Sequence, residues 1–128
     1  MRLSPLAVIL ALSLPATGAL AQDVPAALLG RWVGTGTETD GTTWPMELDL
    51  RADGASVWYP SFPCAARWLL DPALGGATVT GVESLTAGID LCSDNLALQL
   101  RAGDKGGLIV EWYDANAAAV ARAELDRP

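Results

Sequence analysis

The sequence predicts an all-β fold, a small eight-stranded antiparallel up-and-down barrel that carries one disulfide. Three observations predict it. Apolar and polar residues alternate over short segments through most of the chain, and turn residues separate these segments at regular spacing. No segment is a convincing crossover helix, so neighbouring strands are expected to pair antiparallel through hairpin turns. Closure of such a meander also removes the free sheet edges that an exported protein would otherwise expose.

The first 21 residues have the pattern of a secretory signal peptide. Arg2 gives a basic start, residues 6–14 are apolar, and the small residues at 19–21 form a cleavage site before Gln22. The apolar stretch is shorter than the roughly 20 residues that span a bilayer. We therefore expect a single domain at 22–128, without membrane insertion, in the periplasm or outside the cell.

The first two strands are predicted at 30–36 and 44–51. The second shows the clearest period of two, because Met46, Leu48 and Leu50 alternate with charged residues. One face of this strand is therefore expected to lie in the core and the other in solvent.

The next hairpin turns at Asp53-Gly54, a pair that suits the twist of antiparallel strands. It leads into a third strand at 55–59. The proline-containing bend at 60–63 separates this strand from a fourth at 64–70.

Four further strands complete the prediction, at 77–85, 96–100, 108–113 and 118–125. The last is rich in alanine and would suit a helix on propensity alone. Its short connection from the preceding strand favours a returning strand instead. The segment 23–29 is expected to form a short helical turn that covers one end of the barrel.

The two cysteines, Cys64 and Cys92, are expected to form a structural disulfide. An even pair in a small exported domain usually does so, and only one pairing is possible. A redox or metal role would favour a closer spacing or a histidine, and the chain has neither.

Gly30-Arg31-Trp32 on the first strand, with a basic residue at the end of the last, resembles the barrel-closing pair of the calycin superfamily, which includes lipocalins and avidins. The resemblance implies that a late cation packs over Trp32, as cation–π attraction favours. Arg127 is the first choice because it follows Leu125 at a period of two, and Arg122 is the alternative.

A second resemblance covers most of the mature chain. Tyr59-Pro60-Ser61 followed by Cys64, then Trp68, Glu83 and Cys92, is similar to an uncharacterised group of small exported bacterial domains with a Tyr-Pro-Ser-x-x-Cys signature. The resemblance implies the barrel fold and no established activity.

The amino-acid composition argues against several classes of function. The net charge of −7 argues against nucleic acid and anionic membrane surfaces as partners. The absence of histidine removes histidine-dependent nucleophiles and imidazole metal sites. We expect no cofactor, no metal and no enzymatic activity, although oxygen ligands near Asp90 and Asp94 leave a calcium loop as a minor alternative.

Five residues are candidates for ligand binding. One tryptophan is out of step with the apolar residues of its strand, and another lies at a strand end. A tyrosine precedes the proline bend, and two charged residues could form a buried ion pair. These residues are Trp44, Trp58, Tyr59, Arg67 and Glu83.

The sequence thus favours a monomeric, non-enzymatic binding domain of the cell envelope that holds a small molecule, glycan or peptide at the barrel mouth. An eight-stranded barrel has room for one small ligand at most. The alternative is a proteinaceous inhibitor of a secreted or periplasmic hydrolase, which would insert either the loop from Tyr59 to Cys64 or the segment 22–29 into the enzyme.

Overall fold

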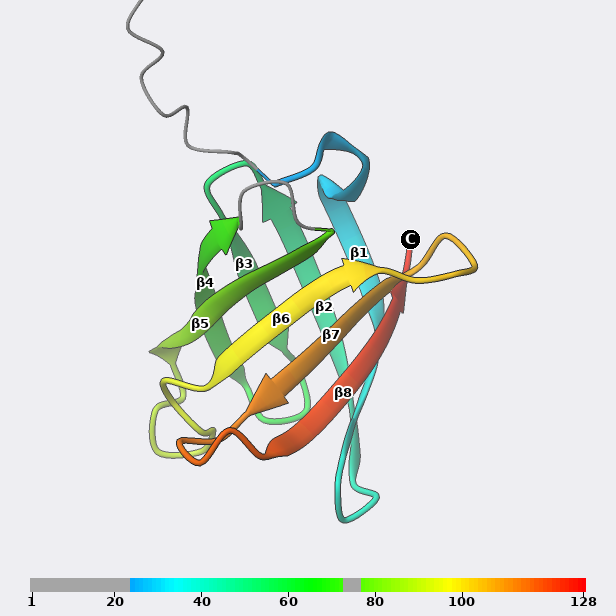
Figure 1. Cartoon of the computed structure of the whole chain (residues 1–128). Coiled ribbons are helices and arrows are strands. Elements are labelled where there is room, and N and C mark those ends of the chain that lie inside the picture. The colour runs from blue at the N-terminus through cyan, green and yellow to red at the C-terminus, as the bar shows by residue number, and fades with distance from the viewer. Residues whose placement is uncertain (1–23, 73–76) are drawn as a thin grey trace, which may run out of the picture.

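The computed structural model describes residues 24–72 and 77–128, which form one closed antiparallel barrel (Figure 1). The predicted all-β class is confirmed. A single 3-10 turn precedes the strands, and the element bounds are η1 Ala26–Leu28, β1 Gly30–Glu38, β2 Thr43–Arg51, β3 Gly54–Tyr59, β4 Cys64–Pro72, β5 Thr78–Ala87, β6 Ala97–Ala102, β7 Leu108–Tyr113 and β8 Ala119–Asp126. The predicted signal peptide at 1–21 lies outside the described residues.

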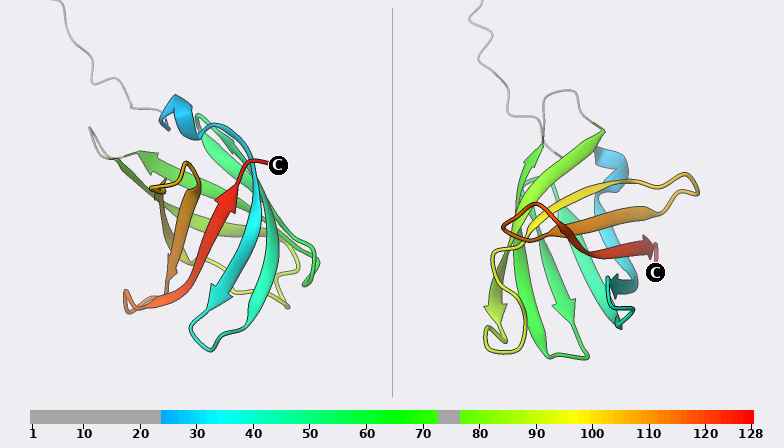
Figure 2. Two further views of the ribbon diagram at one scale, coloured as in Figure 1. Left: turned by 90° about the vertical axis from the view of Figure 1, so that its right-hand side faces the viewer. Right: turned by 60° about the horizontal axis from the view of Figure 1, so that its bottom comes forward.

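Each strand pairs with the next along the chain, and β8 returns to pair with β1. The closing register aligns Gly34 with Leu125 and Gly36 with Ala123. The alanine-rich last segment is therefore a strand, because pairing on both sides outweighs its helical propensity. Figure 2 shows β8 between β7 and the first strand.

Inward side chains from all eight strands fill the barrel. The alternation is sharpest in β2 and β7, where buried and less buried residues follow one another at a period of two. The bulkiest side chains that are almost completely buried are Trp68, Trp112, Met46, Leu50, Leu100, Leu108 and Leu125. The middle of the barrel is therefore packed with side chains, which leaves space for a ligand only near an end.

The end of the barrel beside η1 is closed by Trp32 and Arg127. The Trp32 indole is 2% exposed and donates a hydrogen bond to the Leu28 carbonyl at 2.8 Å. The Arg127 guanidinium carbon lies 3.8 Å from the centre of the Trp32 ring, and its nitrogens donate to the carbonyls of Leu29 at 2.7 Å and Ala27 at 3.0 Å. One cation thus ties the end of the chain to η1 and β1.

Arg122, the alternative partner for Trp32, lies elsewhere. It is exposed and forms ion pairs with Glu111 at 3.5 Å and Glu124 at 3.1 Å on the outside of β7 and β8. Arg127 is therefore the residue that covers Trp32.

The predicted disulfide is present between Cys64 and Cys92, whose Cα atoms are 6.5 Å apart. It ties the start of β4 to the loop between β5 and β6. Gly88 passes so close to this bond that a Cβ there would lie 2.7 Å from the Cys64 sulfur, and its φ of +75° also favours glycine. The loop is thus fixed against β4 by a covalent bond and a tight backbone approach.

Within the described ranges, no helix is long and apolar enough to cross a bilayer.

Candidate functional site

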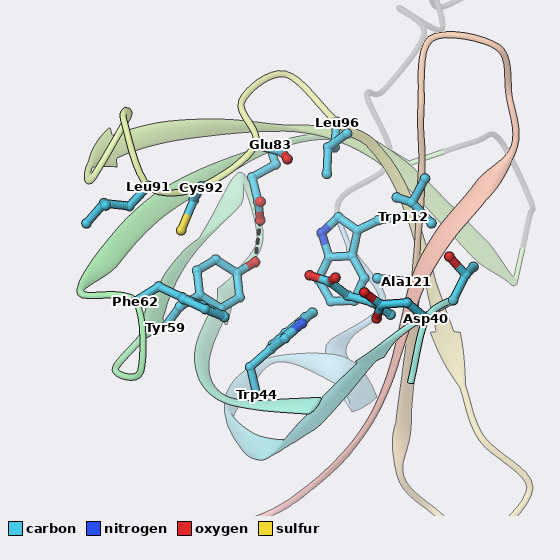
Figure 3. Close-up of a pocket in the computed structure, with 14 residues that line it drawn as sticks. Asp40, Trp44, Tyr59, Phe62, Glu83, Leu91, Cys92, Leu96, Trp112 and Ala121 are labelled. Carbon is cyan, nitrogen blue, oxygen red and sulfur yellow. Dashed lines mark hydrogen bonds between the residues drawn. The ribbon is translucent and has the colours of Figure 1, made fainter. Parts of the chain in front are cut away.

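A cavity of about 360 Å³ lies at the end of the barrel where β1 ends, opposite the end that Trp32 closes. Figure 3 shows the residues that line it. The turns that follow β1, β3 and β5 meet at this end and contribute to its walls. The residues that line it are Glu38, Thr39, Asp40, Trp44, Tyr59, Phe62, Glu83, Leu91, Cys92, Ser93, Leu96, Trp112, Val120 and Ala121. This volume is within the range of small-molecule sites.

A second hollow, of about 380 Å³, lies beside the turn between β6 and β7. The charged side chains that line it, including Lys105 and Glu124, are exposed. It therefore lacks the enclosed polar group that distinguishes the cavity at the other end.

That enclosed group is Glu83, which is 4% exposed. It lies on β5 at a period of two from Leu85, so its side chain points into the barrel. The Tyr59 hydroxyl and the Trp68 indole nitrogen both donate hydrogen bonds to its Oε2, the second at 2.7 Å. Figure 3 shows the carboxyl reaching toward the Tyr59 ring at one side of the cavity.

Burial has the largest effect on this carboxyl and raises the pKa of Glu83 above its ordinary value. Polar contacts with Tyr59, Trp68 and Trp112 act in the opposite direction. Burial and the nearby carboxylate together raise the pKa of Tyr59 well above its usual range, so the phenol remains a donor.

Three aromatic rings stand around the same space. Trp44 packs edge-to-face against Tyr59 with ring centres 5.3 Å apart, and against Trp112 with ring centres 5.4 Å apart. The interplanar angles of 90° and 74° mean that the rings face different directions. They form walls around a shared space rather than a flat stack.

Trp44 occupies its position because Gly36, its partner on β1, has no side chain. A Cβ at Gly36 would lie 2.1 Å from the Trp44 ring. Any larger residue at 36 would force the indole to move, so the glycine gives the cavity one of its walls.

The indole nitrogen of Trp44 is buried and has no hydrogen-bond partner among the described residues. Buried indole N–H groups usually have one. The only group of this kind in the described part of the chain thus belongs to a residue that lines the cavity.

The structure brings together three of the five predicted binding residues, namely Trp44, Tyr59 and Glu83. Trp58 lies on the outer face of β3 and is 40% exposed, away from the cavity. Its position opposite Glu47 and Ala65 leaves it on the solvent side of the sheet.

Arg67 also lies on the outer face, where it is exposed and pairs in register with Ser84 on β5. The interpretation of Arg67 and Glu83 as a buried ion pair is wrong. Adjacent register pairs on two strands point to opposite faces, and Glu83 is in register with Trp68. The partners of Glu83 are a phenol and an indole instead.

Trp112 was not among the predicted binding residues, although it lines the cavity. Sequence reasoning also missed the rim residues Glu38 and Asp40. The sequence could have indicated these rim residues in part, because every second turn of an up-and-down barrel lies at the same end. Which of the turn residues fold over the opening depends on tertiary packing.

The described residues contain no group of three or more candidate metal ligands. In the loop considered for calcium, Asp94 Oδ1 accepts hydrogen bonds from the backbone N–H groups of Leu85 and Asn95, both at 2.9 Å. Asp94 thus organises the backbone of the β5–β6 connection.

Compared with known proteins, the chain matches no family model and no curated protein sequence. Fold and site therefore define it by architecture, as a closed eight-stranded antiparallel barrel with one disulfide and an aromatic cavity at its open end. A buried carboxyl at that cavity is its main chemical feature.

The raised pKa of Glu83 predicts a loss of stability with increasing pH. Between the unfolded-state value, about 4.3, and the higher folded-state value, the folded chain keeps a proton that the unfolded chain releases. The free energy of unfolding therefore falls through this interval and levels off above it. Glu83→Gln removes this contribution, so its stability relative to the original protein should rise with pH and then become constant. Urea unfolding from about pH 4 to pH 8 measures the difference.

Glu111 provides a control of opposite sign. Hydrogen bonds from Arg101 and Tyr113 lower the pKa of Glu111, so its contribution is present above the unfolded-state value and is lost as the pH falls through the folded-state value. Glu111→Gln should therefore lose stability relative to the original protein as the pH rises from acid values. Parallel curves for Glu83→Gln and the original protein would contradict the assignment of a raised pKa to Glu83.

Proposed function

We propose that this protein is a non-enzymatic binding domain of the cell envelope that holds a small molecule in the cavity at the open end of the barrel. The observation that carries the proposal is the 360 Å³ cavity itself, lined by Trp44, Tyr59 and Trp112 and containing the buried carboxyl of Glu83. Apolar walls with a few convergent polar groups are typical of small-molecule sites.

The form of the neighbouring turn supports a small ligand over insertion into an enzyme. The segment 60–63 between β3 and β4 is a tight turn in which the Phe62 N–H donates to the Tyr59 carbonyl at 3.2 Å. Phe62 is half-buried and lines the cavity. The turn thus contributes to the site and does not present a long arm to a partner.

The proposed location is the periplasm or the outside of the cell. The signal-peptide pattern at 1–21 supports it, and the Cys64–Cys92 disulfide is compatible with an oxidising compartment. The resemblance to calycin barrels agrees with a role in binding.

Filling the cavity tests the proposal. Ala121 lies on β8 and lines the cavity, so Ala121→Phe should occupy space that a ligand needs. The purified protein and this variant are compared against a panel of metabolites, glycans and short peptides, by thermal unfolding and tryptophan fluorescence. At least one compound should raise the melting temperature of the original protein and fail to do so for Ala121→Phe.

Ala119→Phe is the matched control, because Ala119 is exposed on the same strand and does not line the cavity. It should keep the response. If no compound binds and the protein is stabilised only by an envelope hydrolase that loses its activity, the inhibitor alternative replaces this proposal.

A further inference from the structure

Resting on the proposed function, we infer that the ligand of this cavity is a small organic cation, an amine or ammonium group with apolar substituents. The carboxyl of Glu83 and the faces of the aromatic walls would hold the charge, and the apolar side chains of the lining would hold the substituents.

The charges of the cavity all have one sign. Three of its lining residues carry carboxyl groups, Glu38 and Asp40 at the rim and Glu83 inside. No lysine or arginine is among the residues that line it in the described part of the chain. With a net charge of −7 on the whole protein, this opening attracts cations and repels anions.

The aromatic walls suit a cation that carries apolar groups. A cation is attracted to the face of an aromatic ring, and several rings at steep angles surround an ammonium group more completely than one ring does. Trp44 is perpendicular to Tyr59 and at 74° to Trp112, so faces of different orientation border the cavity (Figure 3). Phe62, Leu91 and other apolar residues also line the cavity, together with the hydroxyl residues Thr39 and Ser93.

Other ligand classes fit less well. A hard metal ion needs several converging oxygen ligands, and the described residues hold no such group. A sugar needs partners for many hydroxyl groups, whereas Glu83 and Tyr59 are already bonded to each other, which leaves the Trp44 N–H as the one buried side-chain group without a partner among the described residues. An organic ammonium ion requires neither arrangement, because methylated nitrogen is weakly hydrated and has few hydrogen bonds to satisfy.

Three probes of nearly equal shape separate charge from size. Choline is the cation, and tert-butylethanol is its uncharged carbon isostere. The anion is tert-butylacetate, meaning the conjugate base of tert-butylacetic acid and not the ester of tert-butanol. Binding to the full mature protein is measured by calorimetry and tryptophan fluorescence. Choline should bind about tenfold more tightly than tert-butylethanol, and tert-butylacetate should bind most weakly.

Two variants test whether the preference for choline over tert-butylethanol arises in the cavity. Glu83→Gln keeps the shape and one acceptor oxygen but removes the charge, and should reduce the preference for choline severalfold. Trp44→Leu keeps an apolar wall but removes the ring face, and should weaken choline more than tert-butylethanol. This second variant keeps the test decisive if Glu83→Gln does not fold, which circular dichroism establishes. Glu47→Gln is the matched control, because Glu47 is exposed on the outer face of β2, and it should keep the preference.

The outcomes distinguish the two proposals. If tert-butylethanol or tert-butylacetate binds as tightly as choline, or if the two variants retain the preference, the cation inference is overturned and small-molecule binding stands. If none of the three probes binds, the cation inference is overturned, and a compound from the wider panel that Ala121→Phe excludes would still support the proposed function. Failure of that panel as well would overturn both.

Discussion

Replacing Trp32 with alanine should lower the free energy of unfolding by about 3–5 kcal/mol, the range for removal of a buried aromatic side chain. The side chain is 2% exposed and fills the end of the barrel beside η1. Its loss would also leave the Leu28 carbonyl without its donor and remove the surface on which Arg127 packs. Urea unfolding followed by circular dichroism measures the change.

The same substitution at Trp58 is the matched control. Trp58 is 40% exposed on the outer face, so Trp58→Ala should cost about 1 kcal/mol or less. Equal losses at the two positions would contradict the role assigned to Trp32. If Trp32→Ala does not fold, Trp32→Phe should still lose more stability than Trp58→Phe.

A double-mutant cycle extends this prediction to the cation. Arg127 makes its contacts through the Trp32 ring and the carbonyls of η1 and β1. Once Trp32 is alanine, Arg127→Ala should therefore cost less than it does alone, by about 0.5–2 kcal/mol. Additive losses would show that the two side chains act independently.

Removal of the disulfide should have a similarly large effect. Cys64 and Cys92 are separated by 28 residues, and a loop of this size restricts the unfolded chain by about 3–4 kcal/mol on the chain-entropy model. Cys64→Ala/Cys92→Ala should lose that amount in urea unfolding. Because Cys92 also lines the cavity, the loop of residues 88–96 should exchange its amide hydrogens faster in the double variant.

Reduction provides the control within the same experiment. A reducing agent should lower the stability of the original protein to that of the double variant and leave the variant unchanged. A reduced protein as stable as the oxidised one would refute the prediction.

The strand order, and the strand limits to within about two residues, could be predicted because one face of each strand is buried. Met46, Leu48 and Leu50 show that pattern directly, and all three are buried. The strand at 108–113 has the predicted limits, whereas β1 extends to Glu38 and β5 to Ala87. Those extensions depend on backbone pairing with neighbouring strands, to which the side-chain pattern is insensitive.

The residues of the candidate site could be predicted less well from the sequence than the strands. The prediction that Glu83 is buried is confirmed. Its hydrogen-bond partners are 24 and 15 residues away in the chain, and strand register alone brings them together. The period of two shows that Trp58 is out of step with the apolar residues of its strand, but it does not tell which side of a closed sheet meets a ligand.

The structural contacts of Trp32 and Arg127 and the cavity lie at opposite ends of this barrel, which makes the protein suitable as an engineering scaffold. At one end, Arg127 packs on Trp32 and ties the end of the chain to η1 and β1, while the turns at the other end surround the cavity. The side chains of Asp40 and of residues 60–63 can therefore be varied as a library without altering the β1–β8 pairing or the contact between Trp32 and Arg127. Selection from such a library would yield receptors of new specificity on an unchanged frame, with the emission of Trp44 and Trp112 as a built-in reporter of binding.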